Sequence, residues 1–96
     1  MGFRKLRGVR LSWERQGYVY FTCQTFENQP KRTQEKICRL CNRHGGEYSD
    51  ALFELLTTKR SVVAVAMKYN VSDRTLYRLR REFYEGWYGG GRVQGR

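Results

Sequence analysis

Three arginines and a tyrosine near the end of the chain have side chains and a spacing suited to binding nucleic acid. Arg74, Tyr77, Arg78 and Arg81 follow one another at steps of three, one and three residues, so all four lie on one face if the segment is helical. The guanidinium fork of arginine matches guanine O6 and N7 or phosphate oxygens, and tyrosine can contact a thymine methyl group or a backbone oxygen. The alternative is the solvated face of an amphipathic helix, with Arg81 paired to Glu85 one turn later.

Two polar residues stand directly before this face. Ser72 is a good N-cap, and the free N–H groups of a first helical turn can hold a phosphate. Asp73 repels phosphate, but its carboxylate can accept a hydrogen bond from a cytosine amino group and so read sequence. The candidate DNA-binding residues are therefore Ser72, Asp73, Arg74, Tyr77, Arg78 and Arg81.

A second chemically capable group lies earlier in the chain. Cys38, Cys41 and His44 follow at three-residue steps, with Cys23 in reserve, and thiolate and imidazole are zinc ligands. Structural zinc sites usually place such pairs on a knuckle or loop, whereas the apolar residues between these predict an ordinary core helix with small buried cysteines. We therefore expect no metal and no other cofactor. Because the nine acids are scattered and form no catalytic pair, we also expect no enzymatic activity.

Helices must position these residues, and the sequence predicts four of them after residue 29. Leu76, Leu79, Phe83 and Trp87 form an apolar stripe opposite the arginine face, which is the pattern of a helix lying on a core. The first predicted helix contains Ile37, Leu40 and Cys41 and stops at His44-Gly45-Gly46, and the second runs from an N-cap at Ser49 or Asp50 to about Thr57. The third spans residues 62–69 and is capped by Ser61, and the fourth begins at Asp73 and is capped by Ser72.

The N-terminal part has the pattern of strands. Val9, Leu11 and Trp13 alternate with polar residues, and residues 18–26 are rich in aromatic and β-branched side chains, with Gly17 available for a loop. The fold class that follows is mainly α, with an N-terminal β-hairpin over residues 8–26 and a three- to four-helix domain. We expect three parts: a hairpin extension over 1–28, a helical domain over 29–88 and a flexible Gly/Arg tail over 89–96.

Residues 62–81 resemble the helix-turn-helix of bacterial and phage transcription regulators. Ala66 is the small residue where the two helices approach, Asn70 stands where the family usually has glycine, and Ser72 caps the second helix. Apolar side chains occupy the positions that lock the two helices together, at Val65, Tyr69, Val71, Leu76 and Leu79. More loosely, residues 29–88 are similar to the fourth region of bacterial sigma factors. The resemblance implies that the second helix enters the major groove of DNA, N-terminal residues first.

The charged residues of the chain indicate which class of partner it favours. Nineteen lysines and arginines against nine acids give a net charge of +10, which favours phosphate backbones or anionic surfaces. No apolar run approaches the roughly 18 residues of a membrane helix, and the N-terminus lacks a signal-peptide core. We therefore expect a cytoplasmic protein with no membrane partner.

Together these features predict sequence-specific binding of double-stranded DNA by a small transcription regulator of a bacterium, phage or mobile element. RNA polymerase is a second candidate partner, and the strand edges and aromatic surface of a hairpin would suit a homodimer. Two alternatives stay open. One is an accessory protein of recombination or excision, and the other is a phage-type protein inhibitor built on a helix-turn-helix scaffold, because a fold alone does not fix function.

Overall fold

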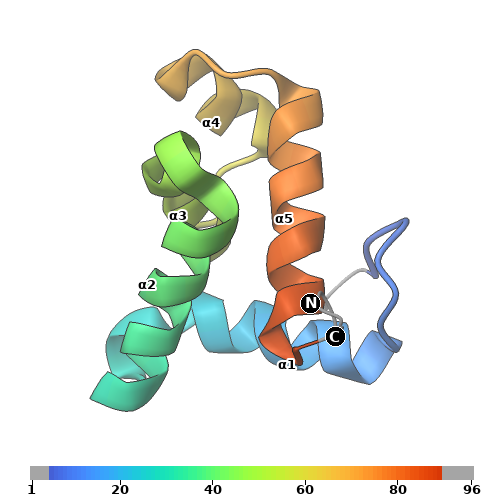
Figure 1. The fold of residues 1–96 in the computed structure, drawn as a ribbon, viewed down its shortest axis with the longest axis vertical. Helices are drawn as coiled ribbons and strands as arrows, with labels where there is room; N and C mark the ends of the chain where they lie inside the picture. Colours follow the sequence, from blue (N-terminus) through green and yellow to red (C-terminus); the bar gives the residue numbers. More distant parts are fainter. Residues whose placement is uncertain (1–4, 90–96) are drawn as a thin grey trace.

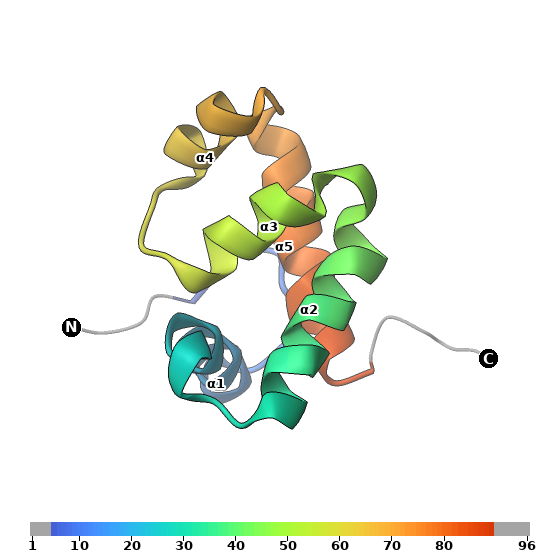
Figure 2. The ribbon, with the colours of Figure 1, turned by 90° about the vertical axis from the view of Figure 1, so that its left-hand side faces the viewer.

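The computed structural model describes residues 5–89, which are mainly helical, as the sequence predicts. In Figure 1, α5 stands upright with α2 and α3 beside it, α4 lies across its upper end and α1 crosses near its lower end; Figure 2 shows the same arrangement from the side of α2 and α3. The elements in chain order are α1 (Trp13–Gln24), η1 (Phe26–Asn28), α2 (Lys31–Gly45), η2 (Gly46–Tyr48), α3 (Ser49–Thr57), α4 (Val62–Tyr69) and α5 (Asp73–Trp87).

The prediction of a β-hairpin over residues 8–26 is wrong, because Trp13–Gln24 forms helix α1 and no strand occurs in residues 5–89. Ser12 caps α1, its Oγ accepting from the backbone N–H of Arg15 at 3.1 Å. Val19 and Cys23, one turn apart, are both buried. Aromatic and β-branched residues favour strands only weakly, and here the burial of a helical stripe outweighs that preference. Gly17 lies inside the helix and not in a loop.

A continuous core joins α1, α2, α3 and α5. Its fully buried centre includes Val19, Ile37, Leu52 and Phe83, one residue from each of these helices. A second cluster joins α3, α4 and the start of α5, and it contains Ala51, Leu55, Val62, Val65, Ala66 and Leu76. The predicted apolar stripe of α5 is confirmed, since its members Leu76, Leu79, Phe83 and Trp87 are all buried.

The predicted helices after residue 29 are confirmed, with one correction at a cap. Helix α4 spans 62–69 as predicted, and Ser61 Oγ accepts from the backbone N–H of Ala64 at 3.1 Å. Helix α3 also has the predicted extent, but Tyr48 is its N-cap, so Ser49 and Asp50 lie within the first turn. The short turn η2 runs directly into α3 and takes the place of a side-chain cap.

Of the predicted tail over 89–96, residues 90–96 lie outside the described residues. Helix α1, from the predicted extension, packs against α3 and α5 of the predicted helical domain. Within residues 5–89, no helix has both the length and the apolar character needed to span a membrane.

Candidate nucleic-acid interface

The connection between α4 and α5 has the geometry of a tight turn. Asn70 adopts the left-handed conformation, with φ 56° and ψ 50°, and is the one residue other than glycine with positive φ in the described chain. Asparagine tolerates this conformation better than most residues. The positive φ of Asn70 confirms the role that the sequence predicts for it. The backbone N–H of Val71 donates to Ala66 at 3.0 Å, and Ser72 Oγ accepts from the N–H of Thr75 at 3.1 Å. The chain therefore enters α5 in a fixed direction.

A polar cluster holds α4 against α3. Glu54, at the centre of this cluster, accepts hydrogen bonds through Oε1 from Lys68 Nζ and from the Tyr69 hydroxyl, both at 2.8 Å. Arg60 Nε lies 3.1 Å from Oε2, as an ion pair without hydrogen-bond geometry. The hydrogen bonds from Lys68 and Tyr69 hold the pKa of Glu54 below its ordinary value. This cluster fixes α4, and with it the start of α5.

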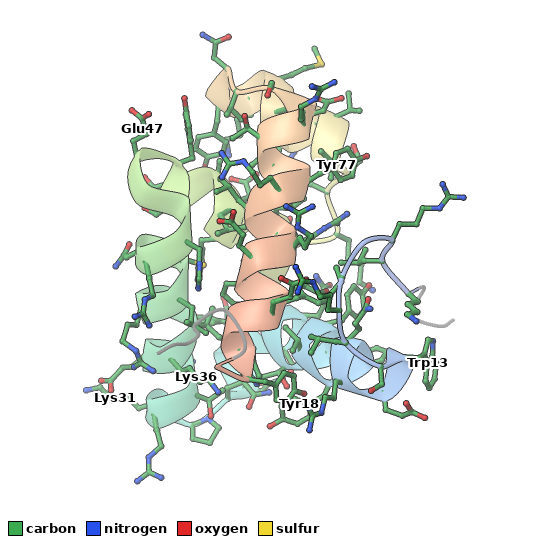
Figure 3. All side chains as sticks on the ribbon, turned by 45° about the vertical axis from the view of Figure 1, so that its right-hand side comes forward. Trp13, Tyr18, Lys31, Lys36, Glu47 and Tyr77 are labelled. Carbon is green, nitrogen blue, oxygen red and sulfur yellow. The ribbon has the colours of Figure 1, made fainter. Side chains whose placement is uncertain are left out.

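The structure brings the predicted site residues together on one face of α5. Ser72 and Asp73 are exposed at its N-terminal end, and Arg74, Tyr77, Arg78 and Arg81 are exposed along it, opposite the buried stripe. Figure 3 shows Tyr77 projecting from the upper half of α5, away from α2. Ser72 uses its side-chain oxygen to cap the helix, so a phosphate at this end would meet the backbone N–H groups.

The ion pairs on α5 differ from the one the sequence suggests. No Arg81–Glu85 pair forms among the described residues; instead Glu85 Oε2 accepts from the backbone N–H of Arg10 at 3.0 Å. Arg78 Nη1 lies 3.4 Å from Glu82 Oε2, with about half of the Arg78 side chain exposed. Such a surface pair contributes only about 0.3–0.5 kcal/mol, so it leaves Arg78 available to a stronger partner.

A groove runs along this face, and sequence reasoning missed one of its walls. Residues 5–11, which we call the N-terminal arm, lie beside α5 and form that wall (Figure 1). The groove has a volume of about 790 Å³, and every charged residue that lines it is a cation. Its lining residues are Lys5, Leu6, Arg7, Val9, Arg74, Tyr77, Arg78, Arg80 and Arg81. We call it the basic groove.

A buried glutamine attaches the arm to the body. The Gln16 side chain is inaccessible to solvent; its Oε1 accepts from the N–H of Leu6 at 2.7 Å and its Nε2 donates to the carbonyl of Leu11 at 3.1 Å. Val9 is buried between these points, and Gly8 turns the chain with φ 76°. Lys5 and Arg7 reach the groove through this docking, and Arg80 lines it from α5; the sequence did not single out any of the three. A polar residue on the apolar face of α1 is the one signal that could have indicated the docking.

The cysteines and the histidine do not form a site. Cys41 is buried in the core, and its burial raises the thiol pKa to about 12; burial raises the pKa of Cys23 too. Cys38 is exposed on another face of α2, and His44 is half-buried against Gly86 of α5. No group of three or more potential metal ligands lies together in residues 5–89.

Comparison of the chain with protein-family models, with curated proteins and with solved structures found no match. The geometry and charge of α5 and of the residues around it are therefore what indicates a function.

Proposed function

We propose that this chain binds double-stranded DNA in a sequence-specific way, as a small transcription regulator, with α5 as the helix that enters the major groove. The exposed face of α5 is the observation that carries the proposal. It presents the exposed side chains of Arg74, Tyr77, Arg78 and Arg81 beside the N-terminal arm, and it follows the Asn70 turn and the Ser72 cap. Cations spaced along one face of a rigid helix are what recognition of a duplex requires.

The dimensions of α5 suit this role. A helix of 15 residues is about 22 Å long, and the major groove, about 12 Å wide, admits one α-helix. When the N-terminal half of α5 is inserted in the major groove, Arg74 and Arg78 face base edges and Asp73 lies nearest the N-terminal end of the helix. Arg81, one turn further along, faces the phosphates that border the groove.

Selection of bound fragments from random duplex DNA tests the proposal. We expect enrichment of a short common sequence, and tighter binding of that sequence than of random duplex by about 10³-fold or more. Fragments without a common sequence, or equal affinity for selected and random duplex, would contradict sequence-specific binding.

The same selected sequence discriminates between roles within DNA binding. Protection of a promoter supports transcription regulation, whereas protection of recombination ends supports the accessory alternative. Tight binding to a purified protein such as RNA polymerase, together with no footprint on any duplex, would favour the protein-inhibitor alternative.

A further inference from the structure

Arg80 is a half-buried cation without an acidic partner. It lies on α5 between the exposed face and the core, and its guanidinium stands 5.4 Å from the ring centre of Tyr77. No carboxylate in residues 5–89 forms an ion pair with it, and burial lowers its pKa. Burying a charge costs free energy unless a counter-charge or hydrogen-bond acceptor compensates it. The described residues supply no anion to compensate the charge of Arg80, so a bound anionic ligand could do so.

Arg80 is one of the residues that line the basic groove, and both walls of this groove carry positive charge. Lys5 and Arg7 stand on the arm, while Arg74, Arg78 and Arg81 stand on α5. Nothing within the described chain brings an acid into this lining. Leu6, Val9 and Tyr77 add apolar surface between the cations. A charged polymer with apolar parts between its charges, such as a sugar-phosphate backbone, matches this lining.

We infer that the basic groove holds the phosphate backbone of one DNA strand, with the arm outside the strand and α5 inside the major groove. The inference rests on the proposed function, because it takes the position of α5 in the duplex as given. A single strand carries one negative charge per 3.4 Å of helix axis, so a row of phosphates can meet Lys5 and Arg7 on the arm and Arg81 on α5. Arg80, a half-buried residue of the lining, then receives an anion that the described residues do not supply.

Gln16 is a positioning residue for this clamp. It holds Leu6 and Leu11 through two hydrogen bonds and touches the groove only through the arm. The second attachment is the hydrogen bond from the Arg10 N–H to Glu85 of α5. Both attachments cross from the arm to helices of the body, so the arm meets DNA already in place. An ordered arm loses less conformational entropy on binding than a free one does.

Three variants and one control test the inference by titration of random duplex at several salt concentrations. Lys5→Ala/Arg7→Ala should make the slope of log K against log salt shallower by about 1.8, which is a loss of about 30-fold in affinity at 0.15 M salt if binding at 1 M salt is unchanged. Arg80→Met, which keeps the length of the side chain, should make the slope shallower by about 0.9. Gln16→Met keeps the net charge and should weaken binding to random duplex, because it removes the two hydrogen bonds that hold the arm. Lys31→Ala/Arg32→Ala removes two exposed cations at the start of α2, neither of which lines the groove, and should change little.

A thermal melt separates a contact from a structural role. Because Arg80 has no acidic partner, Arg80→Met should melt at the same temperature as wild type or higher, while it binds more weakly. If the arm double variant and Arg80→Met both match the α2 control while wild type binds duplex, the inference is overturned and the proposed function stands. If wild type binds no duplex, the proposed function fails first. Equal losses on single-stranded and duplex DNA would also overturn the clamp, since it needs α5 in a major groove.

Discussion

At the scale of single residues, Arg74 and Arg78 carry the sharpest expectation. Both are exposed and lie one turn apart, and the weak pair between Arg78 and Glu82 is the one ion pair of the described structure in which either takes part. Truncation of an arginine that reads a base costs the protein about 1–3 kcal/mol of specific affinity and relaxes its preference at one base pair. We expect Arg74→Ala and Arg78→Ala each to show this loss against the selected duplex. Their melting temperatures should stay within a degree or two of wild type.

Arg32→Ala is the matched control for these two variants, because Arg32 is exposed on α2 and its replacement removes the same charge from another helix. A phosphate-only arginine would instead weaken all sequences about equally and make the salt slope shallower by about one. If both α5 variants keep full affinity and selectivity, α5 is not the reading helix and the inhibitor alternative becomes the leading one.

His44 supplies a pH-dependent expectation. Burial against α5 lowers its pKa from the ordinary value of 6.5; Glu82 opposes this effect and Arg43 adds to it. Below pH 6.5 the unfolded chain therefore binds more protons than the folded one, and the free energy of unfolding should fall as pH falls from about 7 toward 5.5. Denaturant titrations at several pH values measure it. His44→Gln should remove this part of the pH dependence, because the chain has one histidine.

At the scale of elements, the α4–α5 turn makes its own prediction. Asn70 has positive φ, so Asn70→Ala should destabilise the fold by about 1 kcal/mol, whereas Asn70→Gly should be close to neutral. Leu79→Ala, in the buried stripe, should cost about 2–5 kcal/mol and lose DNA binding only through unfolding. Chemical denaturation followed by circular dichroism measures all three. An equal loss for alanine and glycine at position 70 would contradict the conformational account.

The same turn shows why the C-terminal half was predictable from sequence. Caps at Ser61 and Ser72, a left-handed Asn70 and an apolar stripe all act within a few residues of one another, so the local pattern fixes the local structure. Helix α1 behaves differently. Many of its side chains favour strands, and apart from the Ser12 cap it is the burial of Val19 and Cys23 with residues of distant helices that favours the helix.

The candidate site divides in the same way. The cationic face of α5 follows from helical spacing alone and was predicted in full. Lys5 and Arg7 join it only because the arm docks, through Gln16 on α1 and Glu85 on α5. The hydrogen bond to Glu85 spans 75 positions of the chain, and spacing along a sequence does not predict a contact of that kind.

At the scale of the whole molecule, α1 shares one core with the other helices, and we expect the helical part to depend on it. Val19 and Cys23 cover Ile37, Leu52 and Phe83 in one core. We expect a fragment of residues 29–89 to lose cooperative unfolding and DNA binding together, because deleting α1 exposes that core to water. A fragment that melts cooperatively and binds the selected duplex would instead support residues 1–28 as a separable extension. Calorimetry and a binding titration decide between these outcomes.

The overall charge sets how binding responds to salt. The net charge of +10 includes the six cations of the basic groove, which are Lys5, Arg7, Arg74, Arg78, Arg80 and Arg81. If roughly five to eight phosphates are neutralised, log K should fall against log salt with a slope of about −0.9 per contact. Affinity for random duplex should then drop by roughly 10³- to 10⁴-fold between 50 and 200 mM salt. Fluorescence titration over that range measures it, and a flat plot would contradict an electrostatic interface, since released counterions are its main source of free energy.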